Sequence, residues 1–238
     1  MFIVMKDKTA VFKKQTKSVL KLENVWKTYD LGDTKVHAVK GISIDIKKGE
    51  FVSIIGSSGS GKSTTLNIIG ALDKPSKGKV FLDGVDIAPL KDSKLARLRG
   101  KKIGFIFQTF NLNPNLSVYD NIALPMKIHE FPKQEIKQKV SDLIKLVGLN
   151  HRVDHLPRQL SGGERQRIAI ARALSTEPAI LLADEPTGNL DSKTGFAIMD
   201  LIVNLHKQGK TIILVTHESG VADYANRKIV LKDGEVVR

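Results

Sequence analysis

Gly56-Ser57-Ser58-Gly59-Ser60-Gly61-Lys62-Ser63 is the stretch that decides the fold of this 238-residue chain. Glycine, four residues and then Gly-Lys-Ser is the spacing of a loop that binds phosphates. Glycines let such a backbone curl closely enough around phosphates for its N–H groups to point inward. An apolar strand expected at Phe51–Ile55 precedes the loop, and helical character follows at Leu66–Leu72. A glycine-rich turn with a chance lysine is the alternative, but strand and helix together favour nucleotide binding.

The last residues of this loop have predicted roles at a bound nucleotide. Lys62 neutralises the β and γ phosphates, and the hydroxyl of Ser63 holds Mg²⁺. The helix that begins here adds the positive end of its dipole. Together with Thr64, the loop is the predicted nucleotide-binding set.

A second apolar run, Ile180–Ala183, leads directly into Asp184 and Glu185. Open α/β sheets bind ligands at the carboxyl ends of their strands, so Asp184 is placed to support the Mg²⁺ shell. Glu185 can polarise an attacking water as a general base. Alone, this pair before Pro186 would more commonly be a helix cap; beside a phosphate loop, the functional interpretation is favoured.

His217 ends a third apolar run, residues 212–216. Most histidines at strand ends are surface or core residues. This strand is expected beside that of the phosphate loop, which allows a contact with the γ-phosphate that spacing alone does not establish.

Leu160-Ser161-Gly162-Gly163-Glu164-Arg165-Gln166-Arg167 opens a predicted helix that ends near Leu174. Ser161 and Glu164 have the spacing of a capping box, so the stretch can be a well-capped helix start and nothing more. Two glycines after the cap lower helix propensity, which makes sense where a ligand approaches that backbone closely. The stretch therefore predicts a second anion site.

Hydrophobic periodicity predicts an α/β protein: a phosphate-loop NTPase core with a mainly parallel sheet, an N-terminal antiparallel β-subdomain and an inserted α-helical subdomain at about residues 109–175. Residues 1–18 are expected to be a mobile basic extension, and residues 19–238 one ATP-binding domain. The expected strands are 20–26, 36–46, 51–55, 80–82, 85–87, 179–183 and 211–215; the expected helices are 66–72, 117–124, 136–147, 162–174 and 194–206.

Composition narrows the classes of protein further. Lys and Arg number 38 against 25 acidic residues, a net charge of +13, which suggests nucleic acid or an anionic membrane surface as partner. The absence of cysteine excludes disulfide scaffolds, cysteine zinc sites and thiol catalysis. No apolar run approaches the roughly 20 residues of a membrane span, and the N-terminus lacks the order of a signal peptide. We therefore expect a cytoplasmic protein.

Taken together, Gly56–Ser63, Leu160–Gln166 and Ile180–Glu185 resemble the motifs of the nucleotide-binding subunits of ATP-binding-cassette (ABC) transporters, over about residues 20–237. Gln108–Pro114 and Ala183–Gly195 look like the branch that serves lipoprotein release and macrolide export. The cell-division ATPase that partners a membrane protein belongs to the same branch. Asn113 departs from the pattern, because a bulky apolar residue is common there.

The resemblance implies further roles for individual residues. Tyr29 would stack on adenine, although an ordinary loop tyrosine is the alternative. Gln108 would reach Mg²⁺ and the attacking water, making Ser63, Gln108 and Asp184 the metal set, and His217 would contact the γ-phosphate. The residues implied at the dimer interface are Ser161, Gly162, Gly163 and Glu164, which face the nucleotide of the other subunit, and Asp191 in the loop 189–191 that crosses the interface.

The implied mechanism is cooperative. Two copies would enclose two ATP molecules, each between one phosphate loop and the opposing Ser161–Glu164 segment, and hydrolysis would reopen the dimer. Movement near Gln108–Pro114 would push on a separate membrane permease, for export or for lipid or lipoprotein-type substrates. The alternative is a regulatory ATPase that signals through a membrane partner without transport.

A nucleic-acid ATPase is the third hypothesis, favoured by net charge alone. Repair enzymes of this kind need cysteine zinc sites, chromosome proteins long coiled coils and translation factors tandem cassettes, so we expect no nucleic-acid partner. Residues 1–50 contain 11 lysines and 6 acidic residues, and Lys91–Lys102 contains six basic residues and one acidic residue. Either these clusters help hold a peripheral protein at the inner face of the cell membrane, or they are solvated surface.

Overall fold

The computed structural model describes residues 17–32 and 34–237. Of the extension expected at residues 1–18, only Lys17 and Ser18 fall within these residues, and Ser18 already begins the first strand. The elements in chain order are β1 (Ser18–Asp30), β2 (Lys35–Lys47), β3 (Phe51–Ile55), α1 (Lys62–Ile69), β4 (Lys77–Leu82), β5 (Val85–Asp86), α2 (Asp92–Lys102), β6 (Ile103–Phe107), α3 (Val118–Ile128), α4 (Lys133–Leu146), the short 3-10 helices η1 (Asn150–Arg152) and η2 (Pro157–Gln159), α5 (Gly162–Leu174), β7 (Ile180–Asp184), α6 (Ser192–Lys207), β8 (Ile212–Val215), α7 (Ser219–Ala222), β9 (Arg227–Lys232) and β10 (Glu235–Val236).

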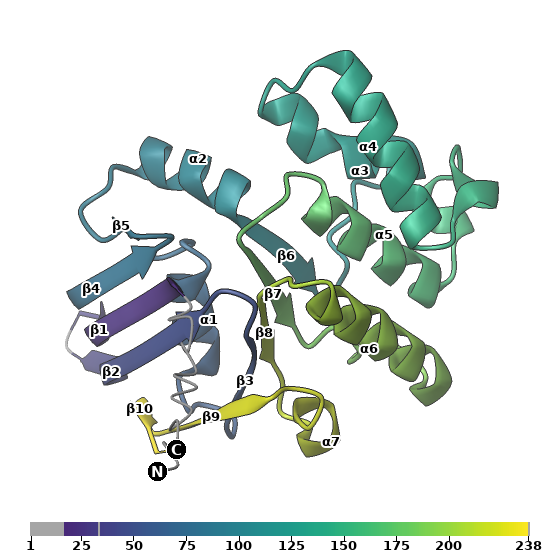
Figure 1. Ribbon diagram of the computed structural model, residues 1–238. Coiled ribbons are helices and arrows are strands. Elements are labelled where there is room, and N and C mark those ends of the chain that lie inside the picture. Colours follow the sequence, from purple (N-terminus) through teal and green to yellow (C-terminus); the bar gives the residue numbers. More distant parts are fainter. Residues whose placement is uncertain (1–16, 33, 238) are drawn as a thin grey trace, which may run out of the picture.

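The strands form two sheets (Figure 1). The N-terminal sheet is antiparallel in the order β2-β1-β4-β5, and the larger sheet has the order β10-β9-β3-β8-β7-β6. In the larger sheet β9, β3, β8, β7 and β6 run parallel, and β10 pairs antiparallel with β9. The predicted α/β class, with a mainly parallel sheet and an antiparallel N-terminal sheet, is confirmed.

The short apolar strands are the centre of the molecule. Successive side chains of a strand point to opposite faces, so an almost continuous apolar run serves a sheet that is covered on both sides. In β8, Ile212 and Leu214 pack with residues of α3 to α6, whereas Ile213 and Val215 pack with the N-terminal sheet and α1. The parallel sheet therefore lies between two apolar cores.

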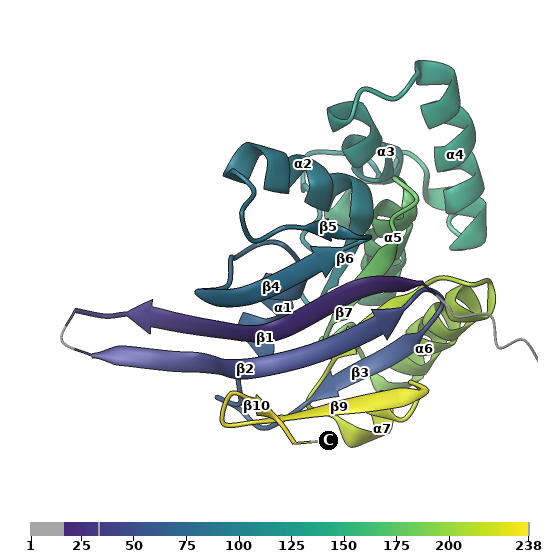
Figure 2. The same cartoon turned by 60° about the vertical axis from the view of Figure 1, so that its left-hand side comes forward.

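Helices fill the chain between β6 and β7. Buried residues of α3, α4 and α5 share one core, and Figures 1 and 2 place α3 and α4 far from the β1–β2 hairpin. The description of residues 109–175 as an inserted subdomain stays a prediction. In residues 17–32 and 34–237, no helix has the length and apolar character needed to cross a membrane.

The structure corrects the bounds of two expected helices and contains elements that were not predicted. The helix expected at 66–72 begins at Lys62 and ends at Ile69, because Ala71 has a left-handed φ of 52°. Helix α3 continues to Ile128, past Pro125. Helix α2 and strand β6 were not predicted; α2 lacks an apolar stripe, since Leu95 is its one buried residue.

Candidate nucleotide site

The parallel register brings the predicted motifs to one edge of the sheet. Asp184 at the end of β7 pairs with Val215 of β8 and with Phe107 of β6, directly before Gln108. Strand β8 also pairs with β3, whose end at Ile55 leads into the phosphate loop. The expectation that the His217 strand neighbours the phosphate-loop strand is confirmed.

A pocket of about 800 Å³ opens at this edge. It contains most of the phosphate loop, the predicted general base and His217, together with residues of β2 and of the turn before β10. The lining residues are Val36, His37, Ala38, Lys40, Ser58, Gly59, Gly61, Lys62, Ser63, Thr64, Glu185, His217, Asp233 and Gly234. This volume falls within the usual range of small-molecule and cofactor pockets, so a nucleotide could fit.

The phosphate loop has a backbone that only glycine accommodates at its tightest points. Gly61 has a φ of 94°, and a Cβ atom there would lie 2.5 Å from the carbonyl oxygen of Ala38. A Cβ atom on Gly56 would lie 2.4 Å from the carbonyl oxygen of Leu231. The loop is therefore packed against β2 and β9 through its backbone.

Lys62 has neutral partners in this structure. Its Nζ donates to the carbonyl oxygens of Gly56, at 2.6 Å, and Ser57, at 2.7 Å. Helix α1 begins here with no side-chain cap and no acidic residue in its first turn. A lysine without a carboxylate and an uncapped helix start together fit a phosphate group.

Glu185 and His217 form a close pair at the mouth of the pocket. Glu185 has a left-handed φ of 44°, and its Oε1 lies 2.6 Å from Nδ1 of His217. The hydrogen bond and the charge of Glu185 raise the pKa of His217 above its ordinary value of 6.5. Burial, and then the charge of Glu185, raises the pKa of Asp184. The structure thus holds one carboxylate oriented by an imidazole beside a second, more buried carboxylate.

The residues present fit Mg²⁺ only together with phosphate oxygens. In the described part of the chain, no cluster of three His, Asp or Glu side chains could hold a metal alone. Mg²⁺ usually takes one or two carboxylates, water and substrate phosphates as ligands. Ser63 lines the pocket, and Asp184 directly precedes Glu185, which also lines it. This donor set suits a metal that arrives with a nucleotide.

The side chain of Gln108 packs against Gly188, in the segment that follows Glu185. A Cβ atom on Gly188 would approach Nε2 of Gln108 to 2.6 Å, and Nδ2 of Asn189 donates to the carbonyl oxygen of Gln108 at 3.0 Å. The loop containing Gln108 is therefore in direct contact with the loop 189–191.

A second group of predicted residues gathers at the starts of α5 and α6. Ser161 Oγ accepts a hydrogen bond from the Glu164 amide at 3.2 Å, and Glu164 Oε2 accepts one from the Ser161 amide at 2.9 Å, which completes the predicted capping box. A Cβ atom on Gly163 would lie 2.5 Å from the methyl group of Thr194, and Asp191 caps α6. Among the described residues, none of this group lines the phosphate-loop pocket.

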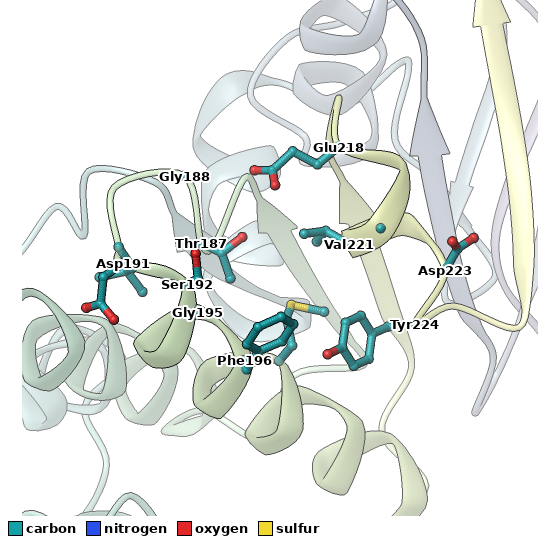
Figure 3. Close-up of a pocket in the computed structure, with 13 residues that line it drawn as sticks. Thr187, Gly188, Asp191, Ser192, Gly195, Phe196, Glu218, Val221, Asp223 and Tyr224 are labelled. Atoms are coloured by element: carbon teal, nitrogen blue, oxygen red, sulfur yellow. The ribbon is translucent and has the colours of Figure 1, made fainter.

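A separate hollow of about 590 Å³ lies between α6 and α7. Figure 3 shows the rings of Phe196 and Tyr224 side by side in it, with Glu218 above them. Asp191 is the one residue of the predicted set that lines it. The hollow lacks the glycine-rich loop and its lysine, so we do not place the phosphates there.

Tyr29 lies just beyond the lining of the pocket. It pairs with Val36, which does line the pocket, and its hydroxyl donates to Oδ2 of Asp73 at 3.0 Å. The Nζ atom of Lys27 is 5.0 Å from the centre of the Tyr29 ring. Stacking of this ring on adenine stays a prediction.

Several lining residues were missed by sequence reasoning. Four residues of β2 and the turn Asp233-Gly234 reach the pocket through long-range packing; the four are Val36, His37, Ala38 and Lys40. The Lys40 amide donates to the carbonyl oxygen of Gly234 at 2.8 Å. Asp233-Gly234 was recognisable as a turn, but no local pattern signals its proximity to the phosphate loop.

A phosphate loop at the carboxyl edge of a mainly parallel sheet, with a carboxylate pair at the end of β7, separated from β3 by β8, defines a phosphate-loop NTPase. A family model described as ABC transporter matches residues 39–188, and the chain belongs to this family, as one of its ATP-binding ATPase chains.

Relatives of several organisms cover nearly the whole chain. An uncharacterized ABC transporter ATP-binding protein of Thermotoga maritima is 49% identical over 92% of this chain and 94% of its own length. The macrolide export ATP-binding/permease protein MacB of Chlorobium phaeobacteroides is 49% identical over 92% of this chain, which spans 33% of that larger protein. The dimeric post-hydrolysis structure of the ATP-binding cassette MJ0796 of Methanocaldococcus jannaschii, bound to ADP and Pi, has a TM-score of 0.83 and 48% identity, covering 92% of this chain and 97% of that one.

Proposed function

We propose that this chain is the ATP-hydrolysing motor of a transporter and that two copies enclose two ATP molecules. The observation that carries the proposal is the separation of the predicted site into two groups. The phosphate loop, Glu185 and His217 share one pocket, whereas Ser161 to Glu164 gather beside Asp191 outside it. A second copy in head-to-tail arrangement would supply the missing group to each pocket. The MJ0796 structures are dimeric, which supports the pairing of two copies.

The residues of the pocket have distinct roles in the proposed reaction. Lys62 exchanges the carbonyl oxygens of Gly56 and Ser57 for phosphate oxygens, which carry negative charge. Glu185 accepts a proton from the attacking water, and His217 orients its carboxylate. Ser63, Asp184 and Gln108 would hold Mg²⁺, which would supply positive charge to offset the charge of the phosphates.

The proposed membrane partner docks beside the loop that contains Gln108. A largely apolar cavity of about 270 Å³ lies between the end of α2, β6, α3 and α5, and Phe107, Asn111 and Arg172 are among its lining residues. MacB, by its name, combines an ATP-binding part and a permease, which supports a membrane permease as the partner of this ATPase. We place the protein peripherally at the inner face of the membrane, serving export or lipid and lipoprotein-type substrates.

Glu185→Gln tests the catalytic assignment. The amide keeps the shape of the carboxylate but cannot accept the proton, so we expect ATP hydrolysis to fall by at least about a hundredfold. ATP binding should persist, and a stable dimer should accumulate with ATP in light-scattering chromatography. Glu135→Gln, at an exposed position of α4, is the matched control and should retain normal hydrolysis. Normal hydrolysis by Glu185→Gln would show that another group is the base.

Capture of the membrane partner tests the transporter assignment. We expect a membrane protein to co-purify with the tagged chain from detergent-solubilised membranes and to stimulate its hydrolysis of ATP. Transport of substrate by the reconstituted pair supports the motor, whereas hydrolysis without any transport supports the regulatory alternative.

A further inference from the structure

Half-buried Arg172 of α5 reaches the loop that follows β6. We call residues 108–117 the Gln108 loop. The Arg172 guanidinium donates from Nη2 to the carbonyl oxygen of Phe110 at 2.8 Å and from Nη1 to that of Asn111. Burial lowers the pKa of Arg172, and no carboxylate pairs with it among the described residues. A half-buried charge thus has two loop carbonyls as its partners.

The same two loop residues have a strained backbone. Phe110 and Asn111 are consecutive non-glycine residues with left-handed φ values of 63° and 50°. Such a conformation costs about 1 kcal/mol or more per residue, so external contacts must hold it. The two charge-assisted hydrogen bonds from Arg172 are contacts of the required strength.

Helix α5 contacts the Gln108 loop a second time. The Arg165 guanidinium lies 5.1 Å from the centre of the Phe110 ring. Arg165 and Arg172 are seven residues apart, which places both on one face of the helix. Buried Gln166 also donates from Nε2 to the carbonyl oxygen of Pro186, just after Glu185, at 2.8 Å. The helix that begins at the Ser161 cap is therefore joined to the loop and to the catalytic segment.

The far end of the Gln108 loop is held by a different helix. Asn121 of α3 is fully buried, and its Nδ2 donates to the carbonyl oxygens of Asn113, Leu116 and Ser117 at 2.9 to 3.1 Å. Its Oδ1 accepts a hydrogen bond from the Asn113 amide at 2.8 Å. The loop is thus fastened at one end to α3 and at the other, nearest Gln108, to α5.

This geometry points to Arg172 as a positioning residue that makes the Gln108 loop and α5 move as one body. The inference rests on the proposed function, in which the loop meets the membrane partner and the start of α5 meets the nucleotide of the second copy. A displacement of the loop would then move Ser161 to Gly163 through Arg172. Without Arg172, the residues nearest Gln108 would lose both hydrogen bonds to α5 and keep the weaker contact of Phe110 with Arg165, while Asn121 would still hold Asn113.

Hydrogen exchange followed by mass spectrometry tests this link without any need for turnover. In Arg172→Met, we expect the amides of residues 108–112 to exchange about tenfold faster or more, the factor that loss of hydrogen bonds to a charged group implies. The amides of residues 56–63 should be unchanged. Arg172→Lys keeps the positive charge but lacks the forked guanidinium that can bind two carbonyl oxygens. The amides of residues 108–112 should therefore exchange at an intermediate rate in this variant. Arg167→Met is the matched control, because Arg167 lies on the same helix and has no hydrogen bond to the loop among the described contacts.

Kinetics supply the second readout. If the link positions Gln108, Arg172→Met should lower kcat about tenfold and leave KM for ATP within twofold, because the phosphate loop is untouched. Unchanged exchange at 108–112, or an equal rise across the whole chain, would overturn the inference. If Arg172→Met does not fold, the same comparison is made with Arg172→Lys. A fast-exchanging loop in a variant with wild-type kcat would also overturn it. Failure of Glu185→Gln to stop hydrolysis would instead count against the proposed function.

Discussion

At the scale of single residues, the pair Glu185 and His217 determines the orientation of the carboxylate that we propose as the general base. The imidazole binds one carboxylate oxygen, at 2.6 Å, and so fixes the orientation of the other. The side chain of His217 is 61% exposed whereas that of Glu185 is 21% exposed, so the histidine can move toward a ligand while the carboxylate stays in place. This arrangement fits a base that is oriented before the nucleotide binds.

The pKa of His217 provides a direct test of that pair. Because Glu185 stabilises the imidazolium, we expect NMR titration of His217 to give a pKa above 6.5, and Glu185→Gln to bring it back toward 6.5. The stability contributed by the pair is present below the ordinary pKa and is lost as the pH rises through the raised value. The His217→Gln variant assigns the signal. A pKa that Glu185→Gln leaves unchanged would contradict the pairing.

Gly61 tests the packing of the phosphate loop. Alanine there needs a left-handed backbone and places a Cβ atom 2.5 Å from the Ala38 carbonyl oxygen, so we expect nucleotide binding to be lost and the free energy of unfolding to fall by about 2 kcal/mol or more. Gly84→Ala is the control, since Gly84 has a φ of 83° but open space around its Cβ position. It should cost about 1 kcal/mol and leave binding of a fluorescent ATP analogue intact. Equal binding by both variants would contradict the close approach.

The residues that could be predicted from sequence are those whose spacing is itself the signal. Lys62 follows a glycine pattern that forms one local structure, and Glu185 directly follows its apolar strand. The contact of Glu185 with His217 spans 32 positions and depends on the strand order, which periodicity does not give. Lys40 and Gly234 reach the pocket in the same long-range way. The positions of these residues were therefore easier to predict than the partners of each side chain.

At the scale of elements, the starts of α5 and α6 combine a structural and a proposed functional role. Ser161 and Asp191 both cap their helices with side-chain oxygens. Bonds to the Ser161 backbone and hydroxyl lower the pKa of Glu164. A cap of this kind holds the first turn of α5 rigid even though Gly162 and Gly163 weaken its helix propensity.

Two serine caps in the chain allow these roles to be separated. Ser117 caps α3 through the Asp120 amide at 3.1 Å, much as Ser161 caps α5 through the Glu164 amide at 3.2 Å. Ser161→Ala and Ser117→Ala should each lower the free energy of unfolding by about 1 kcal/mol, measured with urea. Only Ser161→Ala should also weaken the ATP-dependent dimer of the Glu185→Gln protein. Equal dimerisation in both variants would show that Ser161 is a cap and nothing more.

Most of the predicted elements have an apolar pattern that indicates burial; β6 has such a pattern and was nevertheless not predicted. The strands β3, β7 and β8 are almost entirely apolar because both of their faces are covered. Helix α2 was missed because it lies on the surface and buries Leu95 alone, so its formation leaves no amphipathic pattern. The early end of α1 depends on the left-handed Ala71, whose carbonyl oxygen accepts a hydrogen bond from Nη1 of the distant Arg99 at 2.8 Å.

At the scale of the whole molecule, part of the net charge of +13 can be located on one helix, α2. On α2, Lys94, Arg97 and Lys101 are exposed, and their spacing of three and four residues puts them on one face. The other basic residues of the helix point to the protein, since Arg99 binds Ala71 and Lys102 binds Asp83. Gly100 of this helix also lines the cavity at which we place the membrane partner. The exposed basic face therefore flanks the proposed docking site.

This location predicts that α2 contributes to binding at an anionic bilayer. Each basic residue near such a surface is worth about 1 kcal/mol, so changing Lys94, Arg97 and Lys101 to Glu should weaken binding to vesicles rich in anionic lipid by on the order of a hundredfold at low salt. Co-sedimentation measures it, and added salt should weaken wild-type binding because exposed charges are screened. The matched control changes Lys133, Lys137 and Lys145 to Glu, three exposed residues of α4. Equal loss in both triple variants would mean that net charge alone drives adsorption, and no loss in the α2 variant would leave its basic face as solvated surface.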